Sequence, residues 1–194
     1  CTRLRPMLPA EPRWLTQVHG IDVLDADGAC GATLEPHADA AVTRRRGTPC
    51  AVLVADCLPV LFASRSADAI GVAHAGWRGL AAGVIEATLD AMALPGSEVL
   101  AWLGPAIGAR AYEVGAEVRD TFVARDPAAQ AAFVPSRPGH WWLDLYAIAR
   151  RRLAARGVAQ VYGGGFCTHR EPALFFSWRR ERAAARMAAV IWLT

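Results

Sequence analysis

The sequence predicts an α+β fold, a single domain with mixed β-sheets flanked by helices. Short apolar stretches cluster in the first half of the chain, whereas helical patterns arrive later and singly, so the order is not the regular βαβ alternation of a doubly wound fold. The chain has 194 residues, 54% of them hydrophobic and 20% charged, which suffices for one sizeable core. We therefore expect one domain over residues 1–194.

Five short apolar stretches in the first half are bounded by Gly, Pro or Asp and are typical of strands. They are too apolar to be half-exposed, so we expect a sheet that is covered on both faces. The stretches are residues 14–18, 38–43, 50–55, 60–63 and 69–73.

A helix is predicted next, over residues 79–92, because Leu80, Val84, Ala87 and Ala91 form one stripe and Leu94-Pro95-Gly96 follows as a stop signal. The second half of the chain is expected to contain both strands and helices, with Gly-rich loops at 104–108 and 163–165. Strands are expected at 99–103, 158–162 and 187–193, and helices at 115–124 and 144–155.

Composition excludes several classes of function. All 21 basic residues are Arg, so the chain has no Lys for a Schiff base, a phosphate-binding loop or pyridoxal phosphate attachment. The net charge is only +3, and the Arg clusters are not interleaved with aromatic residues, so we expect no nucleic-acid partner. No apolar run approaches the roughly 20 residues that span a bilayer. Five irregularly spaced Cys residues favour reduced thiols and a cytoplasmic location.

Three separated segments carry the chemistry: Gln17-Val18-His19-Gly20, Ala55-Asp56-Cys57-Leu58-Pro59-Val60 and His74-Ala75-Gly76-Trp77-Arg78-Gly79. They offer two imidazoles and one thiol, the ligand set of an open zinc site. A blue-copper centre uses the same residue types, so these alone do not fix the metal. The spacings of 38 and 17 residues also allow a nucleophile pair of Cys57 and His74, or ordinary buried residues.

The segment after His74 is a candidate anion site. A strand there runs directly into the predicted helix, and a helix N-terminus presents unpaired backbone N–H groups. Arg78 lies in the same turn and could hold a phosphate or carboxylate. Alternatively, Gly76 and Gly79 only permit a tight turn between strand and helix.

Several blocks together resemble the YfiH family, also called the laccase-domain, polyphenol oxidase or purine nucleoside phosphorylase family. The resemblance covers nearly the whole chain in order. It rests on the three segments above together with Gly104-Pro105-Ala106-Ile107-Gly108, Cys167-Thr168 and Phe175-Phe176-Ser177-Trp178-Arg179-Arg180-Glu181.

The resemblance implies a compact α+β domain, similar in architecture to a bacterial toxin deamidase domain with a Cys-His pair. It implies Zn²⁺ on His19, Cys57 and His74, with Cu²⁺ as an opportunistic occupant. It also implies phosphorolysis of purine nucleosides (adenosine, inosine, guanosine and methylthioadenosine) and hydrolytic deamination of adenosine. The expected partners are a purine nucleoside and inorganic phosphate, and the chain is expected to be a monomer or weak dimer.

Alternatives stay open at this point. Asp56 is a candidate proton carrier, or it orients the neighbouring ligand. A bacterial branch of the family is linked to peptidoglycan-precursor editing, and a cysteine-type hydrolase would use Cys57 and His74 directly. A copper-dependent phenol oxidase is disfavoured because the chain has only five His residues, and a non-enzymatic binding module is a further alternative.

The chain departs from the family pattern in three places. Family members usually begin with a further segment, whose absence would open part of the substrate pocket. Ala184-Ala185-Arg186 stands where Thr-Gly-Arg is usual, and Ala149 lies near a usual Asn. Substrate preference could therefore differ. His140 is expected to pack within a loop and Cys167 to be a packed thiol, whereas His37 and His169 are expected at the surface or behind the ligands. The side chains of Tyr112, Arg179 and Arg186 could reach the pocket or brace the fold.

Overall fold

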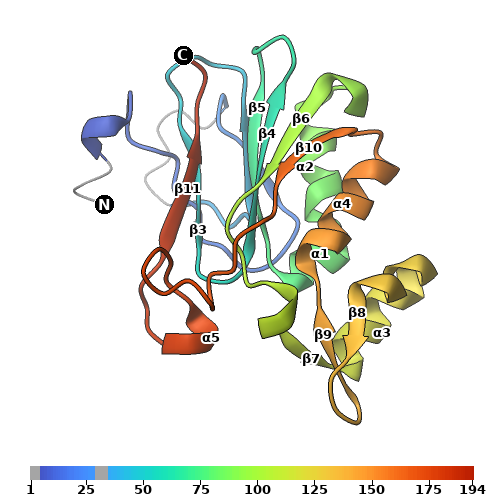
Figure 1. Ribbon diagram of the computed structural model, residues 1–194. Helices are drawn as coiled ribbons and strands as arrows, with labels where there is room; N and C mark the ends of the chain where they lie inside the picture. Colours follow the sequence, from blue (N-terminus) through green and yellow to red (C-terminus); the bar gives the residue numbers. More distant parts are fainter. Residues whose placement is uncertain (1–4, 29–34) are drawn as a thin grey trace.

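The computed structural model describes residues 5–28 and 35–194 and has a six-stranded mixed sheet at its centre (Figure 1). The strand order is β1-β2-β5-β4-β6-β10; the outer pairs β1–β2 and β6–β10 are parallel and the other neighbours are antiparallel. Mixed pairing of this kind confirms the predicted fold class. The strands are β1 (Val23–Asp25), β2 (Ala40–Thr43), β4 (Leu58–Ser64), β5 (Ile70–Ala75), β6 (Val99–Leu103) and β10 (Gln160–Gly163).

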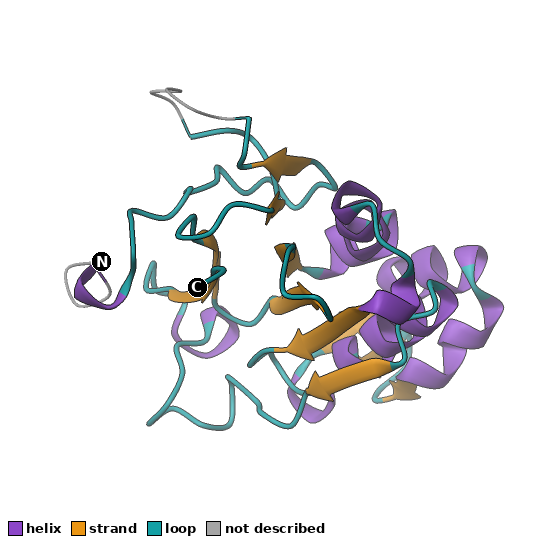
Figure 2. Ribbon diagram, turned by 90° about the horizontal axis from the view of Figure 1, so that it is seen from above, coloured by secondary structure: helices purple, strands orange, loops and turns teal. Residues whose placement is uncertain are grey.

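Both faces of the central sheet are covered, as its apolar strands predicted. Helices α2 (Val84–Met92) and α4 (Leu145–Ala155) lie on one face, and an antiparallel pair, β3 (Cys50–Val54) with β11 (Met187–Ile191), lies on the other (Figures 1 and 2). Each interface has its own group of buried apolar side chains, one including Phe62 and the other Val72. The central strands therefore lie within three layers.

A small antiparallel sheet with the order β7-β9-β8 lies beside α3 (Ala116–Arg125), at the lower right of Figure 1. The sequence did not predict its strands, because three or four residues are too few to show a period. The structure thereby places His140 on a strand rather than in a loop. The strands are β7 (Glu113–Gly115), β8 (Phe133–Pro135) and β9 (His140–Leu143); a 3₁₀ helix covers Pro127–Ala132.

The helix predicted over 79–92 is wrong in its continuity, because it is two helices. Helix α1 (Trp77–Ala82) ends at Gly83, and α2 begins immediately after it. Gly83 has φ of 114°, a left-handed conformation that any larger residue would adopt only with strain. Arg125 donates hydrogen bonds of 2.7 Å to the carbonyl oxygens of Ala81 and Ala82, which the break leaves without helical partners.

The strand predicted at residues 14–18 is also wrong. Only isolated bridges at Arg13 and Thr16 occur there. The amide of Gln17 takes the place of a strand ladder: it accepts from the backbone N–H of Leu53 at 2.7 Å and donates to the carbonyl oxygen of Leu53 at 2.9 Å. A side chain therefore anchors this segment to β3.

The remaining predicted elements occur with small shifts at their ends. Asp144 caps α4 by accepting from the N–H of Ala147, so the helix starts one residue later than predicted. Strand β10 starts at Gln160 rather than at 158. The short helix α5 (Trp178–Glu181) was not predicted. Within the described residues, none of the helices is both long and apolar enough to cross a membrane.

Candidate metal centre and its cleft

Two imidazoles and a thiol meet at one end of the central sheet. His19 lies in the loop before β1, Cys57 lies between β3 and β4, and His74 lies on β5. One ligand atom from each lies within 4.8 Å of the others, and Cys57 Sγ is 3.8 Å from His19 Nε2. The three residues that the sequence indicated as ligands are therefore neighbours, and together they could hold a metal ion.

Asp39, on the segment that enters β2, orients this group. Its carboxylate accepts from Nδ1 of His74 at 2.7 Å, which directs the other ring nitrogen of His74 toward the remaining donors. It also accepts the backbone N–H groups of Val18, His19 and Gly20 at 2.7–3.1 Å. One buried carboxylate thus positions both histidines of the cluster.

The sequence analysis did not identify Asp39. The available signal was an acidic residue within the apolar stretch at 38–43, where a fully buried carboxylate needs several donors.

The electrostatics of the three donors are coupled. Burial opposes ionisation of the Cys57 thiol, but hydrogen bonds with His19 and His74 lower its pKa to about 6. Burial likewise disfavours a charged His74, yet its hydrogen bonds with Asp39 and Cys57 raise its pKa to about 9. The cluster therefore stabilises a thiolate beside a protonated imidazole, and a bound metal ion would take the place of the imidazole proton.

Two glycines of the third segment are needed because neighbours approach closely. A Cβ on Gly76 would lie 2.9 Å from Cδ2 of His19 and 3.0 Å from Sγ of Cys57. A Cβ on Gly79 would lie 2.8 Å from the carbonyl oxygen of Gly20. The beginning of α1 is therefore packed directly against the donor residues.

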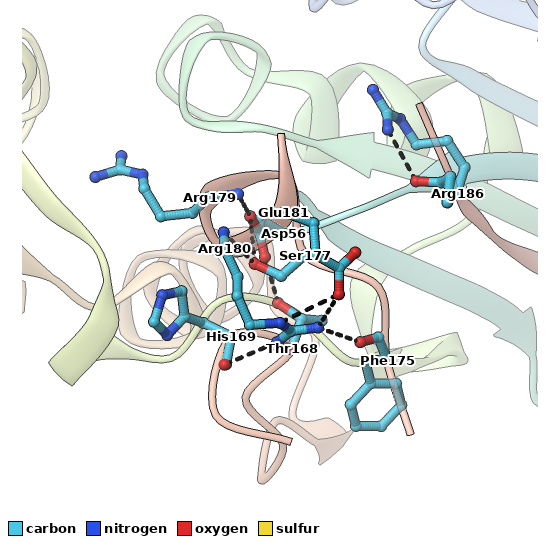
Figure 3. Close-up of polar contacts among 10 residues, drawn as sticks. Asp56, Thr168, His169, Phe175, Ser177, Arg179, Arg180, Glu181 and Arg186 are labelled. Atoms are coloured by element: carbon cyan, nitrogen blue, oxygen red, sulfur yellow. Dashed lines mark hydrogen bonds and ion pairs between the residues drawn. The ribbon is translucent and has the colours of Figure 1, made fainter. Parts of the chain in front are cut away.

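Asp56 connects the centre to the end of the chain (Figure 3). Its carboxylate accepts from the hydroxyls of Thr168 and Ser177 at 2.6 and 3.0 Å, and from the N–H of Arg179 at 2.7 Å. The geometry favours an orienting role over that of a proton carrier, because these donors already occupy both carboxylate oxygens.

Backbone strain also marks the centre. His19 and Asp56 have φ values of 62° and 86°, although neither is Gly. Such conformations cost on the order of 1–3 kcal/mol each and persist where surrounding contacts enforce them. The hydrogen bond from the N–H of His19 to Asp39 holds the first residue in this conformation, and the hydrogen bonds from Thr168 and Arg179 hold Asp56.

A cleft with two lobes opens above the donors, and both lobes include His19, Cys57 and Trp178 in their walls. The larger lobe, of about 400 Å³, is lined by Gln17, Leu53 and Arg186 among others. The smaller, of about 230 Å³, is lined by Arg78, Tyr112 and Arg179 among others. The candidate metal centre therefore lies where the lobes join.

The arginines at the cleft have different surroundings. Arg78 stacks on the Trp77 ring at 4.5 Å and Arg179 on the Tyr112 ring at 5.2 Å, so both guanidinium groups lie at the smaller lobe. Burial raises the pKa of Tyr112 to about 12, which keeps its hydroxyl protonated.

Arg180 and Arg186 act differently from this pair. Arg180 donates to the carbonyl oxygens of Thr168, His169 and Phe175 and therefore braces the C-terminal loop (Figure 3). Arg186 stacks on Trp178 at 5.3 Å and lines the larger lobe.

The other His and Cys residues lie apart from the centre. His37 bridges to Thr16, His140 contacts the carbonyl oxygen of Pro138, and Cys167 accepts from the N–H of Gly108. His169 supplies its backbone carbonyl to Arg180. Among the residues that the structure describes, Cys50, Cys57 and Cys167 are free thiols; Cys1 and Cys30 lie outside those residues.

Fold and site together define an α+β protein in which two histidines and a cysteine that could hold one metal ion lie in an arginine-lined cleft. Comparison with known proteins agrees. Residues 2–194 match the family described as multi-copper polyphenol oxidoreductase laccase, and the chain belongs to this family.

Its relatives include a purine nucleoside phosphorylase of Pseudomonas aeruginosa, 52% identical over 98% of this chain and 78% of that protein. The purine nucleoside phosphorylase YfiH of Escherichia coli is 51% identical over 96% of this chain and 75% of that protein. A crystal structure of a Neisseria meningitidis protein superimposes with a TM-score of 0.93 at 47% identity, covering 99% of this chain and 78% of that one.

Proposed function

We propose that this protein is a zinc-dependent purine nucleoside phosphorylase that acts on adenosine, inosine, guanosine and methylthioadenosine. The observation that carries the proposal is the position of the three donors, at the junction of a small arginine-bearing lobe and a larger lobe. Two reactants, one anionic and one larger, can therefore meet at one point. The names of the relatives support the same reaction.

The donor set suits a catalytic zinc ion. Zinc in such sites takes three protein ligands and keeps a position for water or substrate. Tetrahedral zinc with ordinary bond lengths places a sulfur and a nitrogen ligand about 3.6 Å apart, close to the 3.8 Å between Cys57 and His19. Bound Zn²⁺ would act as a Lewis acid toward an oxygen of phosphate or water.

The smaller lobe is proposed to hold phosphate. Arg78 and Arg179 would neutralise its charge through charge-assisted hydrogen bonds. An oxygen of phosphate attacks the anomeric carbon of the ribose, the bond from that carbon to the purine nitrogen breaks, and its electron pair leaves with the purine. Asp56 would hold Arg179 and Trp178 in place through its hydrogen bonds to the C-terminal segment.

The larger lobe is proposed to hold the nucleoside. The indole of Trp178 offers a stacking surface, Leu53 is 37% exposed beside it, and Arg186 reaches the same space. Ala184 and Ala185 lack polar side chains next to Arg186, so recognition there would depend on the guanidinium.

Deamination of adenosine is a second proposed activity, in which water replaces phosphate as the attacking group at C6 of the purine. Peptidoglycan-precursor editing and a cysteine-type hydrolase that uses Cys57 and His74 are alternatives favoured by the low pKa of Cys57. A phenol oxidase with several coppers is less well supported, because residues 5–28 and 35–194 contain one such donor cluster, with ligands for one ion.

Product analysis tests the proposal. Zinc-loaded protein is incubated with adenosine, with and without phosphate, and the products are separated by chromatography. We expect adenine and ribose 1-phosphate, both of which require phosphate and are lost in Cys57→Ala. Inosine that forms without phosphate indicates deamination. Absence of any product while bound metal is confirmed overturns the purine assignment.

A variant of the smaller lobe tests the phosphate assignment separately. Arg78→Gln should raise the KM for phosphate about tenfold or more, since one charge-assisted contact is lost, and it should leave the KM for adenosine nearly unchanged. Arg65→Gln, at an exposed turn after β4, is the matched control. A larger effect on the adenosine KM than on the phosphate KM would reverse the lobe assignment.

A further inference from the structure

A second cavity, of about 540 Å³ and here called the rear cavity, is lined by residues other than those of the proposed catalytic cleft. Its walls come from the loop at 108–110, the beginning of α4 and the segment 164–171. None of its lining residues belongs to the metal centre or to either lobe of the cleft. The cavity is therefore a separate space, which the proposed reaction does not use.

Two segments of the chain contribute to the wall between the two spaces. Ile107 and Leu145 line the catalytic cleft, whereas the next residues along the chain, Gly108 and Tyr146, line the rear cavity. Hydrogen bonds hold this wall: the N–H of Ile107 donates to the carbonyl oxygen of Asp56, and the N–H of Gly108 donates to Cys167 Sγ. The rear cavity is thus built on fixed backbone.

The lining of the rear cavity contains two arginines and two acidic residues, and of these four only the acidic side chains have hydrogen-bond partners among the described residues. Asp144 is engaged as the cap of α4, and Glu171 accepts the N–H of Cys167 at 2.6 Å. Arg110 and Arg170 are exposed, and neither guanidinium makes a hydrogen bond or ion pair within the part of the chain that the structure describes. Two cations therefore face one cavity with their donors free.

An aromatic surface lies in the same cavity. The ring of Phe166 is 43% exposed, and an edge contact with Phe175, at 5.5 Å between ring centres, fixes its orientation. Phenyl rings stack on planar bases, and arginines bind phosphate oxygens in pairs. The cavity therefore combines the two groups that a nucleotide requires.

We propose that the rear cavity binds a nucleoside monophosphate, with its phosphate on Arg110 and Arg170 and its base on Phe166. Inorganic phosphate shares the anionic group and is the other source of the same chemistry. The proposal concerns a binding site distinct from the catalytic cleft, so it stands or falls independently of the phosphorylase activity.

Calorimetric titration of the zinc-loaded protein tests the site with three probes: adenosine monophosphate, inorganic phosphate and adenosine. The Arg110→Gln/Arg170→Gln double variant should weaken binding of adenosine monophosphate at least about tenfold, since two charge-assisted contacts are lost. Adenosine binding should not change. Competition by inorganic phosphate would show that the phosphate group suffices, and lack of competition would show that the base is also needed.

Two controls keep the test decisive. Arg65→Gln removes an exposed arginine elsewhere and should bind adenosine monophosphate like the parent protein. Phe166→Ala should weaken the binding of adenosine monophosphate more than it weakens the binding of inorganic phosphate. The proposal is overturned if the double variant binds adenosine monophosphate as tightly as the parent protein does. It is also overturned if the variant's affinity for adenosine falls as much as its affinity for adenosine monophosphate.

Discussion

At the residue scale, Asp39 supports the donor set without belonging to it. It is fully buried and accepts four hydrogen bonds, three from the backbone around His19 and one from His74. Asp39→Asn keeps the shape but removes the charge, and the amide can serve fewer of these donors. We expect metal affinity to fall 10–100-fold, the range typical of lost contacts behind metal ligands.

Competition with a chelator measures that affinity, and circular dichroism of the variant reports whether the fold is retained. Asp68→Asn is a suitable control, because Asp68 accepts hydrogen bonds from Ser64 and Ser66 far from the centre. Unchanged zinc affinity in Asp39→Asn would mean that the imidazole of His74 needs no carboxylate to orient it.

Sequence patterns found the donors but not their supports. His19, Cys57 and His74 each lie within a short block with Gly or Pro beside it, which a reader of the sequence can recognise. Asp39 has no such block, and its role follows from the pairing of β2 with β5, which places it beside His74. Contacts made by pairing of distant strands are not encoded in local spacing.

At the element scale, the beginning of helix α1 packs against the loop that carries His19. Gly79→Ala would gain roughly 0.5–1 kcal/mol of helix propensity, yet its Cβ would lie 2.8 Å from the carbonyl oxygen of Gly20. Overpacking of this kind costs about 1–3 kcal/mol, so the clash prevails. We expect a lower melting temperature and at least about tenfold weaker zinc binding, because the backbone beside His19 must move.

Differential scanning fluorimetry and zinc titration check both effects. Gly165→Ala is the matched control, since a Cβ there meets no atom within 4 Å. If Gly79→Ala stabilises the protein and leaves zinc affinity intact, then α1 is not packed against the donor loop as described.

Elements with long apolar stretches were predictable, and short ones were not. Strand β6 matches its prediction at both ends because five apolar residues lie between turn signals. The break at Gly83 was missed because the stripe of Leu80, Val84 and Ala87 has helical spacing on both sides of it. Strands β7 and β8 have only three residues each and depend on their neighbours rather than on a pattern.

At the scale of the whole molecule, three weak acids that are buried or partly buried make stability sensitive to alkali. Burial raises the pKa of the Cys50 thiol from an ordinary 9.0 to about 12, and burial raises the pKa of Tyr112 and Tyr146 to about 12 as well. Above pH 9 the unfolded chain releases the Cys50 proton while the folded chain keeps it. The contribution of these three groups to the free energy of unfolding is therefore full below pH 9 and is lost as pH rises toward 12.

Urea unfolding at pH 8, 9, 10 and 11 measures this decline. Ionisation of Cys50 alone lowers the free energy of unfolding by about 1.4 kcal/mol per pH unit above pH 9. In Cys50→Ala the free energy of unfolding should therefore fall less steeply between pH 9 and 10, whatever the substitution costs in stability at pH 8. An equal slope in both proteins would show that the Cys50 thiol ionises as readily in the folded protein as in the unfolded chain.

The arrangement of layers was only partly predictable. A sheet covered on both faces follows from its apolar strands, but the pairing of β11 with β3 joins residues more than a hundred positions apart. The cleft depends on similar long-range contacts, so Trp178 and the neighbouring Arg179 could not be assigned to it from spacing. Loop-closure entropy opposes such contacts until much of the chain is ordered.

The bonds from Asp56 to Thr168, Ser177 and Arg179 have a consequence for the timing of biosynthesis. All three metal donors lie within residues 19–74, but the residues that complete the cleft are synthesised about a hundred codons later. A nascent chain therefore presents its metal donors well before it can enclose a substrate. In refolding experiments with Co²⁺, thiolate-to-metal absorption should precede protection of the Arg179 amide from hydrogen exchange, and the reverse order would contradict this sequence of events.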